Sequence, residues 1–464
     1  MFIGREQELQ ELNRRYQQKG FQMPVIYGRR RVGKTRLIQE FCKDKPNFFF
    51  SALEQNGPEQ LRGFSEALLT QLPSEGSAFI SSFETWEKAL QYLTLRSSEK
   101  RLVLVIDEYP YLARAVKSIS SLLQRMIDHE WKNSQLYLIL CGSSMSFMEN
   151  QVLGYQSPLY GRRTAQFHLK PLPYWDAIKF FEHWHWQEKL FGYAACGGIP
   201  QYLEYFSAHE NFAMAVKREF LTSSGHLHEE PANLLKQEMH EPAMYHSILT
   251  AIANGASKQN EVATAIQKTG SEITSYLRNL ISLGLISKSL PIGEENAKKT
   301  VYQLEDNLYR FWYNFVPKSL PLISLGLAEE AWKKNVQPCL NEYFGHVFED
   351  ICLQYLSNQV RLGKSSLIYT EFGKWWGTDP LKKAEVEIDL VARNEAGILV
   401  GECKWRNEKV SLNTLKSLEA KASLISAGRK PRYALFSKSG FTEDLTELNR
   451  SDLQLIPAEN VAQG

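Results

Sequence analysis

Hydrophobic and polar positions alternate with two different rhythms along the first third of the chain. Short apolar runs, "MPVIYG", "NFFFSAL", "RLVLVID" and "LYLILCGSS", are separated by longer stretches with helical periodicity. Continuous Val, Ile and Leu runs that alternate with helices are typical of a parallel sheet buried on both faces. Residues 1–170 are therefore predicted to form an α/β domain around a parallel sheet.

The pattern changes after residue 170. Residues 171–235 are helical and aromatic, as in "YWDAIKFFEHWHW", with a break at "CGGIP". Residues 236–320 contain three short helical patterns and then a polar-tipped hairpin, "LISKSLPIGEENAKKTVYQLED". The stretch "NFVPKSLPLISLG" predicts a connector, and residues 321–464 mix helix, hairpin and strand. The pattern thus predicts four segments.

Composition restricts the class of protein but not its partners. A chain of 464 residues is too long for one ordinary core. A net charge of +2 leaves a nucleic-acid partner open, provided that any basic surface is local. The six cysteines form no CxxC pair, the start of the chain resembles no secretory signal, and no apolar run approaches the ~20 residues that span a bilayer. We expect a cytoplasmic protein that does not enter the membrane.

The segment "YGRRRVGKT" has the spacing of a phosphate-binding loop, with Gly28 and Gly33 on either side of four residues and then Lys34 and Thr35. An apolar strand precedes it and a helix follows. The glycines let backbone N–H groups converge on phosphate oxygens, to which the helix N-terminus adds a positive dipole. We expect Lys34 to reach the β- and γ-phosphates of ATP and Thr35 to ligate Mg²⁺. The candidate ATP-binding residues of this loop are Gly28, Arg29, Arg30, Arg31, Val32, Gly33, Lys34, Thr35 and Arg36.

Two acidic residues end a later apolar strand, "RLVLVIDEYPYL". Asp107 is expected to hold the magnesium ion through water, and Glu108 is expected to polarise the attacking water. The alternative for this pair is a solvated turn, or a helix cap at Asp107. The next strand ends in Ser143 and Ser144, whose hydroxyls are candidates for sensing the γ-phosphate.

The motifs "FIGREQELQELN", "GRRRVGKT", "VIDEYPYL", "CGSS", "SPLYGRRT" and "GGIP" occur in the order found in the archaeal-ATPase-like branch of the AAA+/STAND proteins. The chain resembles this family over roughly residues 1–320. The resemblance implies a P-loop AAA+-type parallel sheet with a helical lid, ATP and Mg²⁺ as cofactors, and a nucleotide-dependent homo-oligomer.

The same resemblance implies roles for residues outside the phosphate loop. Gly4 and Arg5 would lie by the adenine, and Pro200 of the lid would pack on the base. Arg162 and Arg163 resemble the arginine that completes the site and neutralises charge in the transition state. The alternatives are a surface arginine pair bound to a carboxylate, and a simple helix–turn–helix joint at "GGIP".

Residues 236–320 resemble a winged helix, because three apolar helical stripes precede the hairpin. A winged helix that reads DNA presents Arg and Lys on its recognition helix. The corresponding stretch offers only Arg278, with Lys288 close behind. A structural or protein-binding role is therefore the alternative to DNA contact.

The stretch "VEIDLVARNEAGILVGECKW" predicts a hairpin with its turn at residues 394–397. This register places Asp389 opposite Glu402, with Lys404 on the same side of the sheet. Two opposed carboxylates repel unless a cation or a proton lies between them. We therefore expect a Mg²⁺ ion held by Asp389 and Glu402, with Lys404 placed to steady charge on an attacked phosphate.

This Asp…Glu-x-Lys pattern resembles the active site of the PD-(D/E)xK nuclease superfamily, although "EID" stands where the family often has a Pro before the Asp. "GHVFEDICLQYL" matches the Gly-x-x-x-Glu helix of its resolvase-like members and offers Glu349 as a further acid. The helix downstream offers Lys416 and Lys421 to a phosphate. The resemblance implies a restriction-endonuclease-like α/β domain. The alternatives are an inactive DNA-binding or structural module and a solvated Glu–Lys pair.

"KWWG" adds Trp375 and Trp376, which are candidates for stacking on bases. Aromatic packing under the sheet is the alternative.

The sequence as a whole predicts an ATPase joined through a winged helix to a Mg²⁺-dependent DNA nuclease-like domain, with the nucleotide state controlling access to the second site. Two other functions stay open. One is a non-enzymatic switch of the STAND kind, whose C-terminal domain only recognises a partner. The other is a DNA remodeller, whose hydrolysis should rise when DNA is added.

Overall fold

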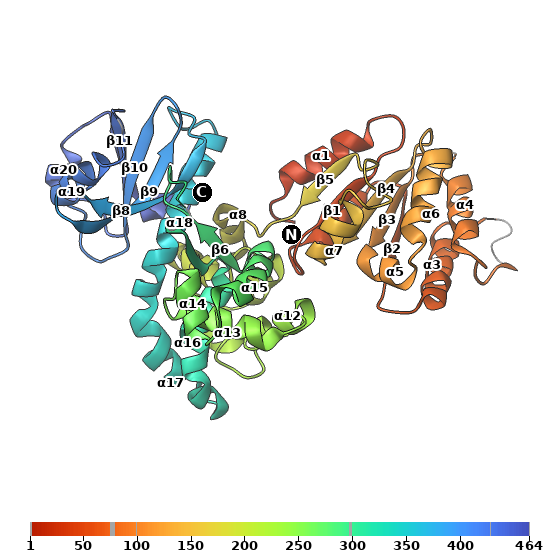
Figure 1. Ribbon diagram of the computed structural model, residues 1–464, viewed down its shortest axis with the longest axis horizontal. Coiled ribbons are helices and arrows are strands. Elements are labelled where there is room, and N and C mark those ends of the chain that lie inside the picture. The colour runs from red at the N-terminus through yellow and green to blue at the C-terminus, as the bar shows by residue number, and fades with distance from the viewer. Residues whose placement is uncertain (1, 75–78, 99, 297–298, 427, 464) are drawn as a thin grey trace. The chain divides into compact units, whose positions relative to one another are not determined.

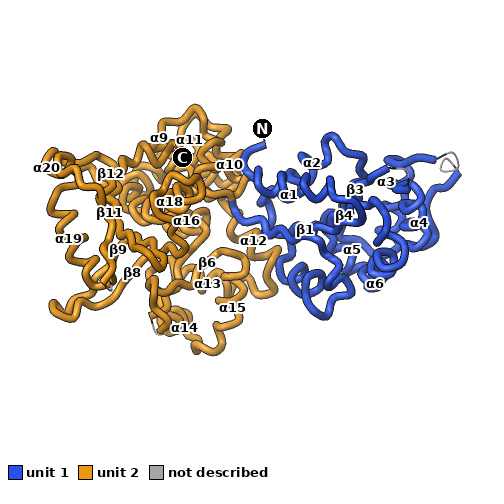
Figure 2. Tube along the Cα trace, turned by 90° about the horizontal axis from the view of Figure 1, so that it is seen from above, with its two compact units in different colours: residues 1–171 blue, residues 172–464 orange. Residues whose placement is uncertain are grey.

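The computed structural model describes the chain apart from residues 1, 75–78, 99, 297–298, 427 and 464 (Figure 1). The chain divides into two compact units, residues 1–171 and 172–464 (Figure 2). The end of the first unit lies one residue from the end of the first predicted segment. The three later segments together make up the second unit.

The first unit contains the predicted parallel sheet. Its five strands pair in the order β2-β3-β4-β1-β5, all parallel. The strands are β1 Pro24–Tyr27, β2 Asn47–Ser51, β3 Val103–Asp107, β4 Tyr137–Gly142 and β5 Ala165–His168. β1, β3 and β4 are buried along their whole length, which explains why their sequences are continuous apolar runs. Since β4 lies between β1 and β3, the ends of these three strands meet at one edge of the sheet.

Helices of the first unit bury aromatic side chains against this sheet. They include α1 Glu6–Tyr16, α2 Lys34–Cys42, α3 Gly57–Gln71, α4 Trp86–Arg96, α5 Tyr109–Ala115, α6 Ile119–Met126 and α7 Met145–Phe147. The ring of Phe41 on α2 lies 5.3 Å from that of Tyr137 on β4. Phe64 on α3 packs edge-on against Phe48 of β2, with 5.2 Å between ring centroids.

The second unit begins with α8 Tyr174–Ala177, α9 Trp186–Cys196, α10 Pro200–Ser207, α11 Phe212–Glu219 and α12 Glu230–Glu238. Next come the three predicted helices and the hairpin. These are α13 Pro242–Ala253, α14 Gln259–Ala265, α15 Gly270–Ser282, β6 Ile286–Ser289 and β7 Val301–Leu304, the last two antiparallel. We call residues 242–304 the helix–hairpin segment.

The "GGIP" turn between α9 and α10 is a close-packed joint. Gly197 has φ 65° and ψ −151°, a conformation that is essentially limited to glycine. Gly198 accepts a 2.7 Å hydrogen bond from Leu172 N–H, and a Cβ atom at Gly198 would lie 1.8 Å from the Leu172 carbonyl oxygen. The structure therefore shows a close-packed joint at this motif, and contact of Pro200 with a nucleotide base stays a prediction.

Replacing Gly198 with alanine is expected to lower the free energy of unfolding of the second unit by about 3 kcal/mol, because the new methyl group overlaps backbone that cannot move freely. Urea denaturation of the full chain measures the change. Gly345→Ala in helix α18 is the matched control, since apart from the neighbouring backbone of that helix no described atom lies within 4 Å of its added Cβ. Equal stability of the two variants would contradict the packing role.

The prediction that "NFVPKSLPLISLG" is a connector is wrong. Residues 307–324 form one helix, α16 Asn307–Ser324, which runs through Pro317 and Pro321. Each proline removes one N–H donor from the helix. The helix persists because one side of it is a buried apolar stripe that includes Phe311, Phe315 and Ile323. Tertiary packing thus overrides the local signal of the two prolines.

The chain ends in a second five-stranded sheet, with the order β12-β11-β10-β9-β8. Its elements are α17 Ala328–Ala331, α18 Leu340–Arg361, β8 Glu371–Asp379, β9 Ala384–Arg393, β10 Ile398–Lys404, α19 Leu412–Ala422, β11 Pro431–Ser437, α20 Glu443–Thr446, β12 Leu453–Pro457 and α21 Ala458–Val461. β8, β9 and β10 are antiparallel, whereas β11 and β12 run parallel to β10. Both α18 and α19 pack against β9 and β10.

Candidate functional site

The phosphate-binding loop lies between β1 and α2, as predicted. A Cβ atom at Gly28 would lie 2.4 Å from the carbonyl oxygen of Leu169, which follows β5, so only glycine fits there. Gly33 is the N-cap of α2 and has φ 92°, which favours glycine for a second reason. The two glycines of the pattern are thus required by the backbone itself.

Lys34 and Thr35 are the first two residues of α2 and lie directly after the loop. The Lys34 ammonium donates to the carbonyl oxygens of Gly28 and Arg29 at 2.9 and 3.0 Å, so it is folded over the loop. The Thr35 hydroxyl donates to the buried Asp107 carboxylate at 2.8 Å. Hydroxyl and carboxylate oxygens are the donors that Mg²⁺ prefers. The pair that the sequence predicts for the ion therefore fits it.

Glu108 has a left-handed backbone, with φ 50° and ψ 43°. One of its carboxylate oxygens accepts hydrogen bonds from Ser143, at 3.2 Å from the N–H and 2.9 Å from the hydroxyl. The Ser143 side chain is buried at the end of β4, next to β3, so the sheet order brings the two residues together. A non-glycine residue in this conformation costs of order 1–3 kcal/mol, and such strain is concentrated at functional sites. The sequence gives no sign of this conformation.

Arg5 links three parts of the first unit. Its guanidinium donates to the carbonyl of Val32 in the phosphate loop and to that of Lys170 beyond β5, and it pairs with Glu8 at 3.2 Å. The N-terminal "GRE" motif is thereby attached to the phosphate loop, in keeping with a place beside the nucleotide. Gly4 precedes it with φ 70°.

The arginines of the loop differ in their environments. Arg29 is buried, Arg31 has φ 67°, and Arg36 is exposed on α2. The Arg30 guanidinium donates to the hydroxyl of Tyr111 at 2.9 Å, a contact that no sequence motif indicates.

The arginines after "LYG" are engaged locally. Arg162 forms a two-bond pair with Asp128, at 2.9 and 2.6 Å, which is the carboxylate-bound alternative. This pairing lowers the pKa of Asp128. Arg163 donates to the Leu153 carbonyl at 3.1 Å. Pro200 is the first residue of α10 and belongs to the second unit. Roles for these residues at a nucleotide stay predictions.

The C-terminal hairpin has the predicted register, from Arg393 opposite Ile398 to Leu390 opposite Gly401. Beyond this point β9 has a bulge that the sequence did not predict. On the side of β8, Gly373 pairs with Val391 and Trp375 with Ile388, so two residues of β9, Asp389 and Leu390, lie opposite Lys374 alone. A bulge of this kind re-aims a side chain. The Asp389 carboxylate accordingly accepts a 2.9 Å hydrogen bond from Cys403 N–H on β10.

Asp389, Glu402 and Lys404 come together, although the strand pairing ends at Leu390 and Gly401 and does not include the predicted Asp389–Glu402 pair, and Lys421 of α19 joins them. The Lys404 ammonium lies 2.5 Å from a Glu402 oxygen and 3.9 Å from an Asp389 oxygen. The Lys421 ammonium pairs with the other Glu402 oxygen at 3.1 Å. Lys416, the second lysine predicted on α19, is exposed. A cation therefore already lies between the two carboxylates, and it is an ammonium group.

The pKa of Asp389 is raised to about 6, because burial and the neighbouring Glu402 and Glu349 all disfavour its charged form. Such crowding of carboxylates favours a divalent cation, and the oxygen donors suit Mg²⁺. Within the described parts of the chain, however, no three His, Cys, Asp or Glu side chains are grouped so that they could hold a metal ion. Water or substrate oxygens would have to complete the coordination of an ion at Asp389 and Glu402.

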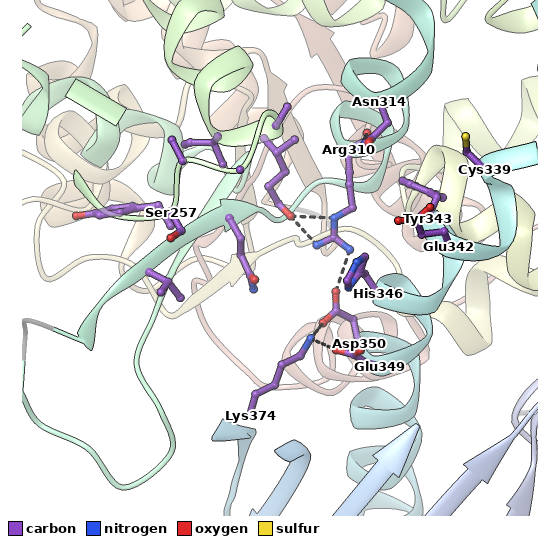
Figure 3. Close-up of a pocket in the computed structure, with 18 of the residues that line it drawn as sticks. Ser257, Arg310, Asn314, Cys339, Glu342, Tyr343, His346, Glu349, Asp350 and Lys374 are labelled. Carbon is purple, nitrogen blue, oxygen red and sulfur yellow. Dashed lines mark hydrogen bonds and ion pairs between the residues drawn. The ribbon is translucent and has the colours of Figure 1, made fainter. Parts of the chain in front are cut away.

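Glu349 is bound to residues that the sequence did not indicate. Its carboxylate binds the Lys374 ammonium at 2.7 Å, and Lys374 also pairs with Asp350 at 3.3 Å. Asp350 in turn binds Arg310 of α16 at 3.0 Å. These four side chains line a pocket of about 860 Å³ inside the second unit (Figure 3). The sequence therefore indicated Glu349 but not its ion pairs, because Lys374, Asp350 and Arg310 belong to no recognised motif.

The tryptophans of "KWWG" have structural positions. Trp375 packs against the buried cluster of the C-terminal sheet, and Trp376 lines the pocket. The packing alternative thus describes Trp375.

Two protein families match the chain. An ATPase domain found predominantly in Archaea matches residues 2–206, and a domain described for archaeal and bacterial proteins of unknown function matches residues 312–420. An uncharacterized protein of Methanocaldococcus jannaschii is 32% identical over 412 residues, which cover 88% of this chain and 88% of that protein. An uncharacterized ATP-binding protein of the same archaeon is 44% identical over 45 residues, 10% of this chain and 76% of its own length.

Solved structures resemble the chain in fold. A Walker-type ATPase of Pyrococcus abyssi has a TM-score of 0.52 and 20% identity, over 67% of this chain and 96% of that one. At this level of identity the likeness concerns the fold alone. In addition, no helix within the described residues has the length and apolar character needed to span a bilayer.

Proposed function

This chain, in which an ATPase domain predominantly from Archaea precedes a domain of unknown function, belongs to the family of its M. jannaschii relative. From this premise we propose that it is a Mg²⁺-dependent ATPase with a DNA-cleaving C-terminal domain. The ATPase assignment follows from the family. The metal, the second activity and the DNA partner are the proposal. The observation that carries it is the Lys404 ammonium, which lies between the carboxylates of Asp389 and Glu402.

The first site has the parts that ATP hydrolysis requires. The N–H groups of the loop and of the α2 N-terminus would bind the phosphates, and Lys34 would turn from its carbonyl partners to the β- and γ-phosphates. Thr35 and Asp107 would hold Mg²⁺, which neutralises developing charge on the phosphates. Glu108, aimed by its backbone and by Ser143, would orient and deprotonate the attacking water.

The second site has the parts of metal-assisted phosphodiester hydrolysis. Asp389 and Glu402 would hold Mg²⁺ in place of the ammonium group, and the ion would polarise the phosphate and its attacking water. Lys404 would then be free to stabilise charge on the phosphate, and Lys421 to contact the backbone of the nucleic acid. The positions of Asp389 on β9, Glu402 and Lys404 on β10 and Glu349 on α18 are consistent with the Asp…Glu-x-Lys resemblance, which supports this proposal.

The helix–hairpin segment has the element order of a winged helix, for which we propose a structural role. The tip of its hairpin is attached to the C-terminal sheet, because Ile292 N–H donates to the Lys374 carbonyl at 2.9 Å. Arg278 is exposed on α15 and remains the candidate for contact with DNA. A homo-oligomer in which Arg162 or Arg163 reaches a neighbouring nucleotide is part of the proposal, although Arg162 must first leave Asp128.

Cleavage assays on the full chain test this function. Labelled linear DNA, branched DNA and RNA are incubated with Mg²⁺ or Mn²⁺, with and without ATP. We expect metal-dependent cleavage of DNA whose rate changes with ATP in the wild type but not in Lys34→Ala. If ATP changes the cleavage rate of Lys34→Ala as much as that of the wild type, nucleotide control is contradicted.

One observation favours a second candidate, a switch without nuclease activity. Both oxygens of Glu402 are bound to lysines, as in a site that has become a structural ion-pair cluster. In this case ATP would control binding of a partner, and Asp389→Asn would leave the biological activity intact.

A further inference from the structure

Lys374 occupies a junction between three parts of the second unit. Its backbone lies on β8 opposite the bulge that carries Asp389. Its carbonyl oxygen accepts the hydrogen bond from Ile292 at the tip of the hairpin. Its side chain, four-fifths buried, extends to α18 and binds Glu349 and Asp350 (Figure 3). One residue thus touches the hairpin tip, the bulge and the acidic helix.

The other end of the hairpin reaches the same ion pairs. The Arg310 guanidinium donates twice to the carbonyl of Leu304, the last residue of β7, at 3.1 and 2.6 Å. It also binds Asp350, which shares Lys374 with Glu349. The hairpin is therefore attached to α18 and β8 at its tip and at its base, and both attachments lead to Lys374.

The positive charge of Lys374 binds the Glu349 carboxylate, which also interacts with Asp389. Glu349 is among the groups that raise the pKa of Asp389, so the two carboxylates interact although Lys374 binds Glu349 at 2.7 Å. The pocket of about 860 Å³ next to these side chains leaves room for them to change partners. An ammonium group and a divalent ion would compete for the same carboxylate.

We propose that Lys374, which the hairpin tip helps to place, is a positioning residue that binds Glu349 in competition with a divalent ion at the Asp389–Glu402 pair and thereby weakens metal binding. The inference rests on the proposed metal site. It assigns to the helix–hairpin segment a control over that site which needs no contact with DNA. Lys374 touches neither substrate nor metal in this role.

Mn²⁺ binding measures this role without any cleavage assay. The full chain, free of nucleotide and carrying Thr35→Val to weaken Mn²⁺ binding at the phosphate loop, is titrated and free Mn²⁺ is followed by electron paramagnetic resonance. Lys374→Met is expected to bind Mn²⁺ about tenfold more tightly, because it removes the positive charge that competes with the metal for Glu349. Lys374→Arg, which keeps the charge, should restore the original affinity.

The hairpin tip is tested by Ile292→Pro, which removes the N–H that binds the Lys374 carbonyl, with Ile292→Val as the matched control. We expect Ile292→Pro to tighten Mn²⁺ binding and Ile292→Val to leave it unchanged. In the Lys374→Met background Ile292→Pro should add nothing, because both changes act through one residue.

The outcomes separate the two proposals. If Asp389→Asn binds Mn²⁺ as the parent does, the proposed metal site fails. If Asp389→Asn loses Mn²⁺ while Lys374→Met binds it unchanged or more weakly, the metal site stands and the role of Lys374 is overturned. Additive effects of Lys374→Met and Ile292→Pro would overturn the link to the hairpin tip.

Discussion

Replacing Glu108 with glutamine is expected to lower the rate of ATP hydrolysis by about a hundredfold to a thousandfold while ATP binding is retained. A general base contributes roughly 10²–10⁴ to a rate, and a glutamine keeps the acceptor oxygen that Ser143 binds but cannot take a proton. Phosphate release in Mg²⁺ measures hydrolysis, and a fluorescent ATP analogue measures binding.

Two further variants serve as controls for the hydrolysis rate of Glu108→Gln. Glu130→Gln, at an exposed acid of the same unit, should hydrolyse ATP at the wild-type rate. Lys34→Ala should lose both binding and hydrolysis, since it removes the ammonium beside the phosphate loop. Full hydrolysis by Glu108→Gln would mean that another group activates the water.

Replacing Asp389 with asparagine is expected to reduce Mg²⁺-dependent DNA cleavage by about a hundredfold or more, because the change removes one of two carboxylates that would hold the ion. ATP hydrolysis should be unaffected, since Asp389 belongs to the other unit. Gel analysis of end-labelled DNA measures the loss. Glu395→Gln, at an exposed acid in the turn of the same hairpin, is the control.

The pH dependence of DNA cleavage is a second test of Asp389 as a metal ligand. The pKa of Asp389 is raised to about 6, so its carboxyl group is largely protonated at pH 5 and charged at pH 8 when no metal is bound. Only the charged form binds a divalent ion. Wild-type cleavage should therefore fall as the pH drops through about 6, and higher Mg²⁺ should move this midpoint downward because metal and proton compete. A rate that is constant from pH 5 to pH 8 would contradict this role of Asp389.

Features set by local patterns were predictable from the sequence. The phosphate loop depends on two glycines whose backbone positions admit no side chain, so its spacing survives in the sequence. The hairpin register followed from its turn, because the period of two fixes which residues face each other. Asp107 and Thr35 met because parallel strands end at one edge of the sheet.

Features set by tertiary packing were not predictable. α16 continues through Pro317 and Pro321 because its buried stripe outweighs two lost donors. The bulge at Asp389 breaks the regular alternation of β9. On a regular strand Ile388 and Val391 would lie on opposite faces, but here both belong to one buried cluster. The left-handed backbone of Glu108 is likewise fixed by its surroundings. In each case a single sequence shows the residue but not the neighbours that hold it.

The contact of the hairpin tip with β8 also affects how the C-terminal domain can be studied. β8 is the outermost strand of its sheet, and an outermost strand that is left bare offers unpaired backbone groups to any other chain. Ile292 covers it at Lys374 and packs against the apolar cluster beneath. A fragment that starts after the helix–hairpin segment would lose this cover, so it should self-associate and precipitate. A lack of nuclease activity in such a fragment would then reflect its low solubility and not the chemistry of its site.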